Sequence, residues 1–413
     1  MSERPLSLFE AWGIEIEYMI VDATTLDVRP IADLALRDAA GGDGWVADVD
    51  DGPIGWSNEL VGHVLELKCA APVASLAGLA DAFGNSLRRL ADVLQRHGAV
   101  ALPGGMHPWM DPARETALWP HEGHEIYAAY DGIFDCRRHG WANLQSMHVN
   151  LPFADDREFA RLLAAIRLVV PLVPALAASS PVHDGRDGRC LDSRLRFYRR
   201  NATRVPAMAG AIVPEPIFDR ERYRDEVLRP ISAQLRALGA PPELLARDWL
   251  NARGAIARFD RMAIEIRVAD AQENPFADLA VAAAVTELVR ALVEERHAAL
   301  ATQQAFSQDA LVAMFPRVAR RGPAASLPPG YAALFGCEGP CETAGELLRT
   351  VLRRRFEGPP ELERPLQRIL ERGTLAERLL AALRAGGGTT RDRLRDVYGR
   401  LQACLRDGAG FLP

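Results

Sequence analysis

Lysine is almost absent from this chain of 413 residues. Lys68 is its only lysine, so arginine supplies nearly all of the positive charge. A phosphate-binding loop of the form Gly-x-x-x-x-Gly-Lys-Ser/Thr is therefore missing, and a Schiff-base lysine could only be Lys68. No Gly-x-Gly-x-x-Gly motif follows an expected strand, which argues against a dinucleotide-binding fold.

Long apolar segments and cysteine frameworks are also scarce. The longest apolar run, 162–178, is interrupted by Arg167, Pro171 and Pro174, so we expect no membrane span. The six cysteines are scattered, and a chain of this length can bury a core without disulfides. The segment 1–8 is short and polar and does not resemble a signal peptide, which favours a cytoplasmic location.

The overall charge is mildly acidic. The chain has 49 basic and 55 acidic residues, a net charge of −6, which argues against general nucleic-acid binding. Its 48% of hydrophobic and 25% of charged residues are typical of a globular, soluble protein. A linker rich in Gly and Pro at 322–330 predicts two parts, a catalytic domain over 1–320 and a C-terminal helical extension over 321–413. Helices are expected there over 342–356, 361–384 and 390–406.

Four short segments alternate apolar residues with charged or polar ones, and most of the charged residues are carboxylates. They are 13–18, 64–68, 147–151 and 264–268. Alternation with period two predicts a β-strand with one apolar and one polar face. If these strands share a sheet, the polar face becomes a floor of Glu and His side chains, which repel one another unless a cation lies among them.

The polar residues of these segments fall into pairs on one face of each strand. Side chains two residues apart leave a strand on the same side, about 7 Å from each other. Each pair alone has a simpler explanation, namely a solvated sheet face, a hydrogen-bonded histidine or a cross-strand salt bridge. Together they would leave a whole sheet face to carboxylates with few lysines beside them. The pairs are Glu15 with Glu17, Glu66 with Lys68, His148 with Asn150, and Glu265 with Arg267.

Glu59 lies seven residues before Glu66. This odd spacing would put it on the opposite face of an uninterrupted strand. Gly62 offers a bend or bulge that could bring the Glu59 side chain back to the polar face. Otherwise Glu59 is an ordinary loop carboxylate.

The chemistry of such a floor points to phosphoryl transfer. Oxygen-rich sites with an occasional imidazole suit Mg²⁺ or Mn²⁺. Two or three ions would neutralise the floor and present positive charge to a polyphosphate, and Arg267 could hold a phosphoryl group with two hydrogen bonds. The sequence therefore predicts a metal-dependent enzyme with the components of phosphoryl transfer.

Six motifs in the same order resemble the type-2 glutamate–cysteine ligase family, which comprises carboxylate–amine ligases with a glutamine-synthetase-like catalytic fold. The resemblance covers about residues 10–300. It rests on Gly-Ile-Glu-Ile-Glu-Tyr at 13–18, Glu59 and Glu66 ahead of Pro72, Gly-Met-His-Pro at 105–108, Met-His-Val-Asn at 147–150, Ser180-Pro181 with Gly-Arg-Asp-Gly at 185–188 and Ser193-x-Leu195, and Ile-Glu-Ile-Arg-Val-Ala-Asp at 264–270.

The resemblance implies an α+β fold. A mostly antiparallel, curved sheet would carry a polar catalytic face, with helices on its other face and a C-terminal helical addition. The implied activity is an ATP- and Mg²⁺-dependent ligation that forms an amide bond, with a γ-glutamyl bond as the expected product. A substrate carboxylate would attack the γ-phosphate of ATP, and an amine would then displace phosphate from the acyl phosphate.

The resemblance also implies roles for individual residues. Arg267 and Glu265 would be catalytic, with Arg267 on the transferring phosphoryl group, and Asn150 and Lys68 would lie beside ATP. Arg253 and Arg258 are weaker candidates for the substrate site. The implied ligands of two or three Mg²⁺ ions (or Mn²⁺) are Glu15, Glu17, Glu59, Glu66, His148 and Glu265. The implied substrate-binding residues are Arg186, Arg189, Arg194, His107 and Ser180.

Departures from the family pattern leave the substrates open. Val182 stands where relatives have Phe after Ser-Pro, the Thr of Asp-Thr-Gly is absent, and Asn150 stands where many relatives have a second His. The partners expected are a small-molecule amino acid and an amine, with a homodimer and a carrier or pathway partner as open alternatives. Two other functions stay open, a phosphotransferase acting on a carboxylate or guanidine without an amine step, and a non-catalytic relative that binds a ligand or partner.

Overall fold

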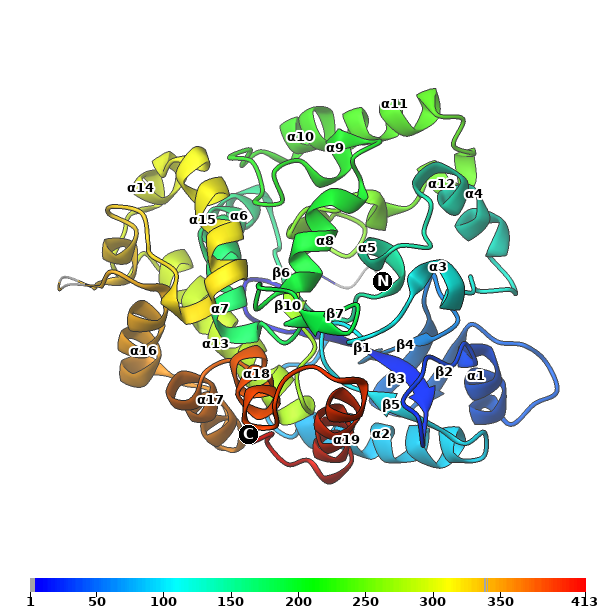
Figure 1. The fold of residues 1–413 in the computed structure, drawn as a ribbon. Helices are drawn as coiled ribbons and strands as arrows, with labels where there is room; N and C mark the ends of the chain where they lie inside the picture. Colours follow the sequence, from blue (N-terminus) through cyan, green and yellow to red (C-terminus); the bar gives the residue numbers. More distant parts are fainter. Residues whose placement is uncertain (1–3, 338, 340) are drawn as a thin grey trace.

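A mostly antiparallel sheet forms the centre of the computed structural model, which describes residues 4–337, 339 and 341–413 (Figure 1). Its order is β2-β3-β4-β1-β6-β10-β9, and β5 pairs with the second half of β1. Every pairing among these described strands is antiparallel, as the resemblance implied. The strands are β1 (Gly13–Asp22), β2 (Asp48–Asp51), β3 (Ile54–Asn58), β4 (Val64–Cys69), β5 (Ala99–Leu102), β6 (Ser146–Pro152), β9 (Ala255–Arg258) and β10 (Ala263–Asp270).

The central strand β1 shows how the alternation builds the fold. Ile14, Ile16 and Tyr18 are fully buried on one face, while Glu15 and Glu17 leave the other face. The apolar face joins one large core with three helices, α2 (Leu79–Gln95), α6 (Asp156–Val169) and α13 (Pro275–Val293). The opposite face is thereby free to carry the polar site.

The long helices begin where the sequence provides caps. Asp155 caps α6 by accepting a hydrogen bond from the backbone N–H of Glu158, and Asn274 caps α13 in the same way from Ala277. Arg167, which interrupts the apolar run, is buried, and its side chain donates to Gln308 and to the carbonyl of Phe306. No helix of the described chain is long and apolar enough to cross a bilayer.

Some of the remaining helices pack on the helices of the apolar face, as α1 does on α2 and α14 on α6. Residues 121–140 contain α4 and α5, and a π-helical turn over Arg224–Leu228 separates α10 from α11. These elements are α1 (Ala32–Ala40), α3 (Pro112–Glu115), α4 (His124–Phe134), α5 (His139–Ala142), α7 (Pro174–Ala177), α8 (Ser193–Asn201), α9 (Pro206–Ala209), α10 (Arg220–Tyr223), α11 (Arg229–Ala237), α12 (Pro242–Leu245), α14 (Leu300–Ala305), α15 (Gln308–Arg321) and the hairpin β7 (Val182–His183) with β8 (Arg186–Asp187).

Four helices occupy the C-terminal part: α16 (Ala344–Arg355), α17 (Pro360–Arg372), α18 (Leu375–Ala385) and α19 (Arg391–Asp407). The expectation of one helix over 361–384 is wrong, because Gly373 adopts φ +89° and Thr374 caps a new helix. Helix α19 lies beside β5 (Figure 1), and both helices of the last pair share a second apolar cluster with Met19 and Leu102 of the sheet. The boundary at residue 320 stays a prediction.

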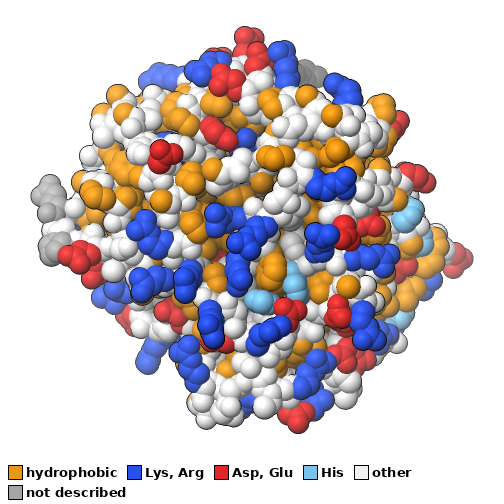
Figure 2. Space-filling view, turned by 45° about the horizontal axis from the view of Figure 1, so that its top comes forward, with side chains coloured by type: hydrophobic (Ala, Val, Ile, Leu, Met, Phe, Trp, Pro, Cys, Tyr) orange, Lys and Arg blue, Asp and Glu red, His pale blue; other side chains and the backbone are white. Residues whose placement is uncertain are grey.

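Two buried charges tie this C-terminal part to the connection between β10 and α13. Arg378 of α18 donates to both carboxylate oxygens of Glu273, at 2.7 and 3.1 Å, and to the carbonyl of Phe411. Both side chains are about 1% exposed. On the outer surface, by contrast, Lys and Arg side chains mix with Asp and Glu across the face drawn in Figure 2.

Candidate active site

The register of β1 gathers the predicted carboxylates. Glu15 lies directly opposite Lys68 of β4 on one side and His148 of β6 on the other, and Glu17 lies opposite Glu66. Directly opposite residues in an antiparallel pair point to the same face. The side chains of three strands therefore converge on one polar floor.

The next strand extends this floor. Glu265 of β10 lies opposite Asn150 of β6, and the Asn150 amide donates to Glu15 at 3.2 Å. Glu265 is 3% exposed and lies between two guanidinium groups, 2.8 Å from Arg258 and 3.1 Å from Arg267. These arginines compete with any cation for the Glu265 oxygens.

Glu59 joins the floor through the connection between β3 and β4, in which Gly62 and His63 form a turn, as the bend predicted at Gly62 allows. It follows the end of β3, and β3 forms a hairpin with β4 in which Ser57 lies opposite Glu66. Residues two apart share a face, so Glu59 shares the face of Ser57 and hence that of Glu66. The odd spacing is resolved by chain reversal between two strands.

A cavity of about 300 Å³ lies over the floor. Most of the predicted residues line it, and so does a wall of aromatic and amide side chains that sequence reasoning missed. The predicted lining residues are Glu15, Glu17, Glu59, Glu66, Lys68, His148, Arg194, Arg258, Glu265 and Arg267. The missed ones include Tyr127, Tyr130, Trp141, Tyr198, Asn201 and Trp249.

Two groups of side chains in this cavity have the spacing of metal ligands. In each group, Glu15 with Glu66 and His148, and Glu17 with Glu59 and Glu66, the ligand atoms lie within 4.8 Å of one another. Glu66 belongs to both groups. The donors are carboxylate oxygens with one imidazole, a set that fits Mg²⁺ or Mn²⁺.

The carboxyl groups of the floor have shifted pKa values, because they are buried close to one another. Burial, reinforced by the charge of Glu15, raises the pKa of Glu66 to about 7. Burial and the charges of Glu66 and Glu17 raise the pKa of Glu59 well above its ordinary value. Burial alone would also raise the pKa of Glu15, but a hydrogen bond and the charge of His148 hold it at about 2. Burial and mutual repulsion therefore disfavour the charged forms of Glu59 and Glu66.

Arg267 is one of several cationic side chains that line the cavity. Its side chain donates to the carbonyl of Asn251 at 3.2 Å. Burial alone would lower its pKa, but Tyr198, Glu265 and Glu17 raise it. Arg267 is thus a fixed cation that faces the carboxylate floor.

Several predicted substrate residues lie elsewhere. His107 is buried and its Nε2 lies 2.8 Å from the carbonyl of Leu26. Arg186 and Arg189 are exposed in and after the β7–β8 hairpin and do not line the cavity. Arg253 is bound to Glu215 at 2.6 and 2.8 Å. A sequence motif gives the order of these residues along the chain, but it does not show whether their side chains reach the cavity.

Ser180 and Arg194 meet at a buried carboxylate. The Ser180 hydroxyl donates to Asp270 at 2.7 Å, and the Arg194 guanidinium pairs with the other Asp270 oxygen. Gly105 is required beside it, because a Cβ there would lie 2.4 Å from the Asp270 carboxyl carbon. The motif residues Gly105, Ser180 and Asp270 thus position one another behind the cavity, and Arg194 lines it.

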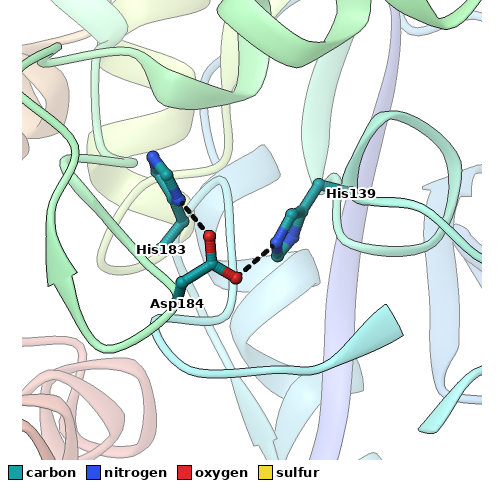
Figure 3. Close-up of side chains that lie close together, drawn as sticks. All are labelled: His139, His183 and Asp184. Atoms are coloured by element: carbon teal, nitrogen blue, oxygen red, sulfur yellow. Dashed lines mark hydrogen bonds and ion pairs between the residues drawn. The ribbon is translucent and has the colours of Figure 1, made fainter. Parts of the chain in front are cut away.

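A second polar cluster joins helix α5 to the β7–β8 hairpin (Figure 3). His139 Nε2 and His183 Nδ1 each lie 2.9 Å from an oxygen of Asp184. Asn143 donates to the carbonyl of His107 and accepts from its N–H, so its NH₂ group faces His139 Nδ1 at 3.1 Å. His139 Nδ1 is therefore an acceptor and Nε2 carries the proton. The trio is a hydrogen-bonded network that anchors α5, rather than a vacant set of ligands.

An antiparallel sheet that gathers carboxylates, an imidazole and arginines under one cavity is the architecture of a carboxylate–amine ligase. The model of the Glutamate-cysteine ligase family 2 (GCS2) matches residues 11–399. The chain belongs to this family of ligases that form carbon–nitrogen bonds, as its motifs indicated.

Relatives and a solved structure agree with this assignment. An uncharacterized protein of Archaeoglobus fulgidus is 30% identical over 97% of this chain and 100% of its own length. A protein of Rubrobacter xylanophilus named "Putative glutamate--cysteine ligase 2-3" is 28% identical over 68% of this chain and 69% of its own. The crystal structure of a glutamate–cysteine ligase from Francisella tularensis in complex with AMP has a TM-score of 0.61 at 12% identity and covers 98% of this chain and 90% of that one, a likeness in fold.

Proposed function

We propose that this protein uses ATP and Mg²⁺ to join an amino acid, with glutamate as the first candidate, to an amine through an acyl phosphate. The observation that carries the proposal is the pair of ligand groups that share Glu66 beneath one cavity. AMP in the Francisella relative supports nucleotide use. We place the reaction in the cytoplasm, with small molecules as substrates and a carrier-bound substrate as an alternative.

The residues of the floor would have two roles, binding Mg²⁺ and orienting the arginines. Glu15, Glu17, Glu59, Glu66 and His148 would hold Mg²⁺, which when bound supplies positive charge to the phosphates. Glu265 either joins them or, as in this structure, orients Arg267 and Arg258.

Arg267 would contact the transferring phosphoryl group, because it is a permanent cation in the cavity and guanidinium groups bind phosphoryl oxygens with two hydrogen bonds. Lys68 lies 3.4 Å from Glu66 at the rim and would face the nucleotide, with Asn150 holding Glu15.

The proposed reaction has two steps. An oxygen of the substrate carboxylate attacks the γ-phosphorus of ATP as the bond to ADP breaks. The amine nitrogen then attacks the acyl carbon, phosphate leaves, and the nitrogen loses a proton. Both steps need water excluded from the acyl phosphate.

A screen of ADP release tests the proposal. Purified protein with Mg²⁺ and ATP is supplied with amino acids, amines and their pairs. A ligase releases ADP in amounts that match amide formed and depend on both partners. ADP release with the carboxylate alone, together with a stable phosphorylated product, would favour a phosphotransferase. The absence of ADP release with every pair would refute both the ligase and the phosphotransferase.

A further inference from the structure

Seven exposed arginines form no ion pair with any described carboxylate, and they come from three segments that lie side by side. We call this group the arginine surface. Its members are Arg186 and Arg189 in and after the β7–β8 hairpin, Arg196, Arg199 and Arg200 of α8, and Arg320 and Arg321 at the end of α15.

Backbone contacts hold the three segments together. The Arg196 side chain donates to the carbonyl of Gly188, which joins α8 to the turn after the hairpin. The N–H groups of Leu191 and Asp192 donate to the carbonyls of the last residues of α15, at 3.3 and 2.9 Å. Helices α8 and α15 are in contact, and Figure 1 shows them beside one another. The three segments therefore present their arginines on neighbouring parts of the surface.

The carboxylates of segment 184–200 have other partners. Asp184 belongs to the network of Figure 3, and Asp192 is buried as the cap of α8. Asp187 lies 3.9 Å from Arg384 of α18. The seven arginines thus keep their charge without a carboxylate of their own segments to balance it.

These guanidinium groups lie close enough to repel one another. Arg196 is three and four residues before the other two arginines of α8, a spacing at which like charges destabilise a helix. Burial and the charge of Arg200 lower the pKa of Arg199. The two signs of charge mix over the surface as a whole, but Figure 2 shows blue side chains gathered in the middle of its face. A local excess of positive charge attracts an acidic partner even when, as here, the whole chain has a net charge of −6.

The arginine surface borders the cavity. Arg194 and Tyr198 on the inner face of α8 line the cavity, and Arg196 and Arg199 lie on the opposite face of the same helix. The two hairpin arginines were expected to bind substrate carboxylates, yet they lie outside the cavity. The carboxylates within their reach therefore belong to a molecule that extends over the surface.

The balance of charge selects the kind of partner. A nucleic acid or an anionic bilayer extends past the arginine surface and meets the rest of the chain, which is acidic and repels it. A short acidic segment of a polypeptide can cover the arginines alone, and guanidinium groups bind carboxylates with two hydrogen bonds. We propose that the arginine surface docks an acidic segment of a partner polypeptide beside the cavity. This docking goes beyond the proposed function and does not depend on turnover.

The test measures binding of a labelled decaglutamate peptide to the full chain by fluorescence anisotropy. The peptide should bind saturably at low ionic strength and more weakly at physiological ionic strength, because salt screens exposed charges. A neutral Gly-Ser peptide of the same length should not bind. Failure of decaglutamate to bind at low ionic strength overturns the proposal.

Paired variants show where the peptide binds. Arg199→Gln combined with Arg200→Gln should raise the Kd for decaglutamate about fivefold or more, since two contacts to carboxylates are lost. Adding Arg320→Gln and Arg321→Gln should raise the Kd further.

The matched control is Arg364→Gln combined with Arg372→Gln. It removes the same charge from α17, where both arginines are also exposed and without an ion pair to a described carboxylate. The control should keep the wild-type Kd, and all variants should keep the wild-type melting temperature because every changed side chain is exposed. An equal loss of binding in the two double variants would show that only the overall charge matters, and it would overturn the proposal.

Two other anions identify the class of partner. Labelled decathymidylate and vesicles with phosphatidylserine should each bind more weakly than decaglutamate. If either binds more tightly and loses that binding in Arg199→Gln with Arg200→Gln, the surface binds phosphate groups and the acidic polypeptide is excluded. These readouts need no turnover, so they decide the docking surface whether or not the ADP-release screen supports the ligase.

Discussion

Glu66→Gln should stabilise the metal-free protein while removing its function. Glu66 is 8% exposed and belongs to both ligand groups. A pKa raised from 4.5 to about 7 corresponds to about 3 kcal/mol against the charged carboxylate in the folded state. Glutamine keeps the shape and lacks the charge, so it relieves up to about 3 kcal/mol of this penalty at pH 8.

The pH window follows from the sign of the shift. A carboxyl whose folded pKa lies above its unfolded pKa contributes fully below the unfolded value and loses stability as pH rises to the folded value. For Glu66 that window runs from 4.5 to about 7. The gain from Glu66→Gln should therefore vanish near pH 4.5 and be complete above neutrality.

Urea unfolding with EDTA, and again with Mg²⁺, measures this directly. Wild type should gain stability from Mg²⁺, because the cation removes the repulsion that the mutation also removes, and Glu66→Gln should gain less. Glu122→Gln, at an exposed position, is the control and should behave as wild type. A Glu66→Gln protein that is less stable than wild type without metal at pH 8, or that responds to Mg²⁺ as wild type does, would refute the reasoning.

Three further changes test other parts of the structure. Glu15→Ala should abolish ADP release with an unchanged circular dichroism spectrum, and wild-type turnover would remove Glu15 from the metal site. Gly105→Ala should cost about 1–3 kcal/mol in urea unfolding, because its Cβ would meet the Asp270 carboxyl carbon at 2.4 Å, and an unaffected midpoint would contradict that packing. Burial lowers the pKa of His107 from 6.5 to about 4, so the unfolded chain binds more protons and stability falls as pH drops from 6.5 toward 4. His107→Gln should remove about 2 kcal/mol of that loss at pH 5, and parallel pH profiles for the two proteins would exclude it.

The floor of the site was predictable because strand alternation is a local pattern. Glu15, Glu66, His148 and Glu265 each sit on a strand whose other face is apolar, and one shared core forces those strands into register. The hairpin that brings in Glu59 was not predictable in the same way. Strand β3 contains Gly55 and is buried on both faces, so it has no period-two signal.

The part of the cavity formed by α5 and α8 could not be predicted from the sequence, because it depends on contacts between segments that are distant in the chain. Trp141 and Asn201 line the same cavity, and α5 approaches α8 closely where Gly140 meets Asn201. The spacing of Arg194, Tyr198 and Asn201 by four and three residues is the local pattern that indicates a shared helix face. Arg186 shows the reverse case, in which a residue of a matching motif is exposed in a hairpin and does not line the cavity.

A single lysine makes the cavity chemically addressable. Lys68 is the one side-chain amine in the sequence, and its Nζ lies at the rim of the cavity, 2.8 Å from the Ser57 hydroxyl. Apart from the α-amino group, an acylating dye therefore has one target, so a fluorophore or cross-linker can be attached beside the floor without introducing a cysteine.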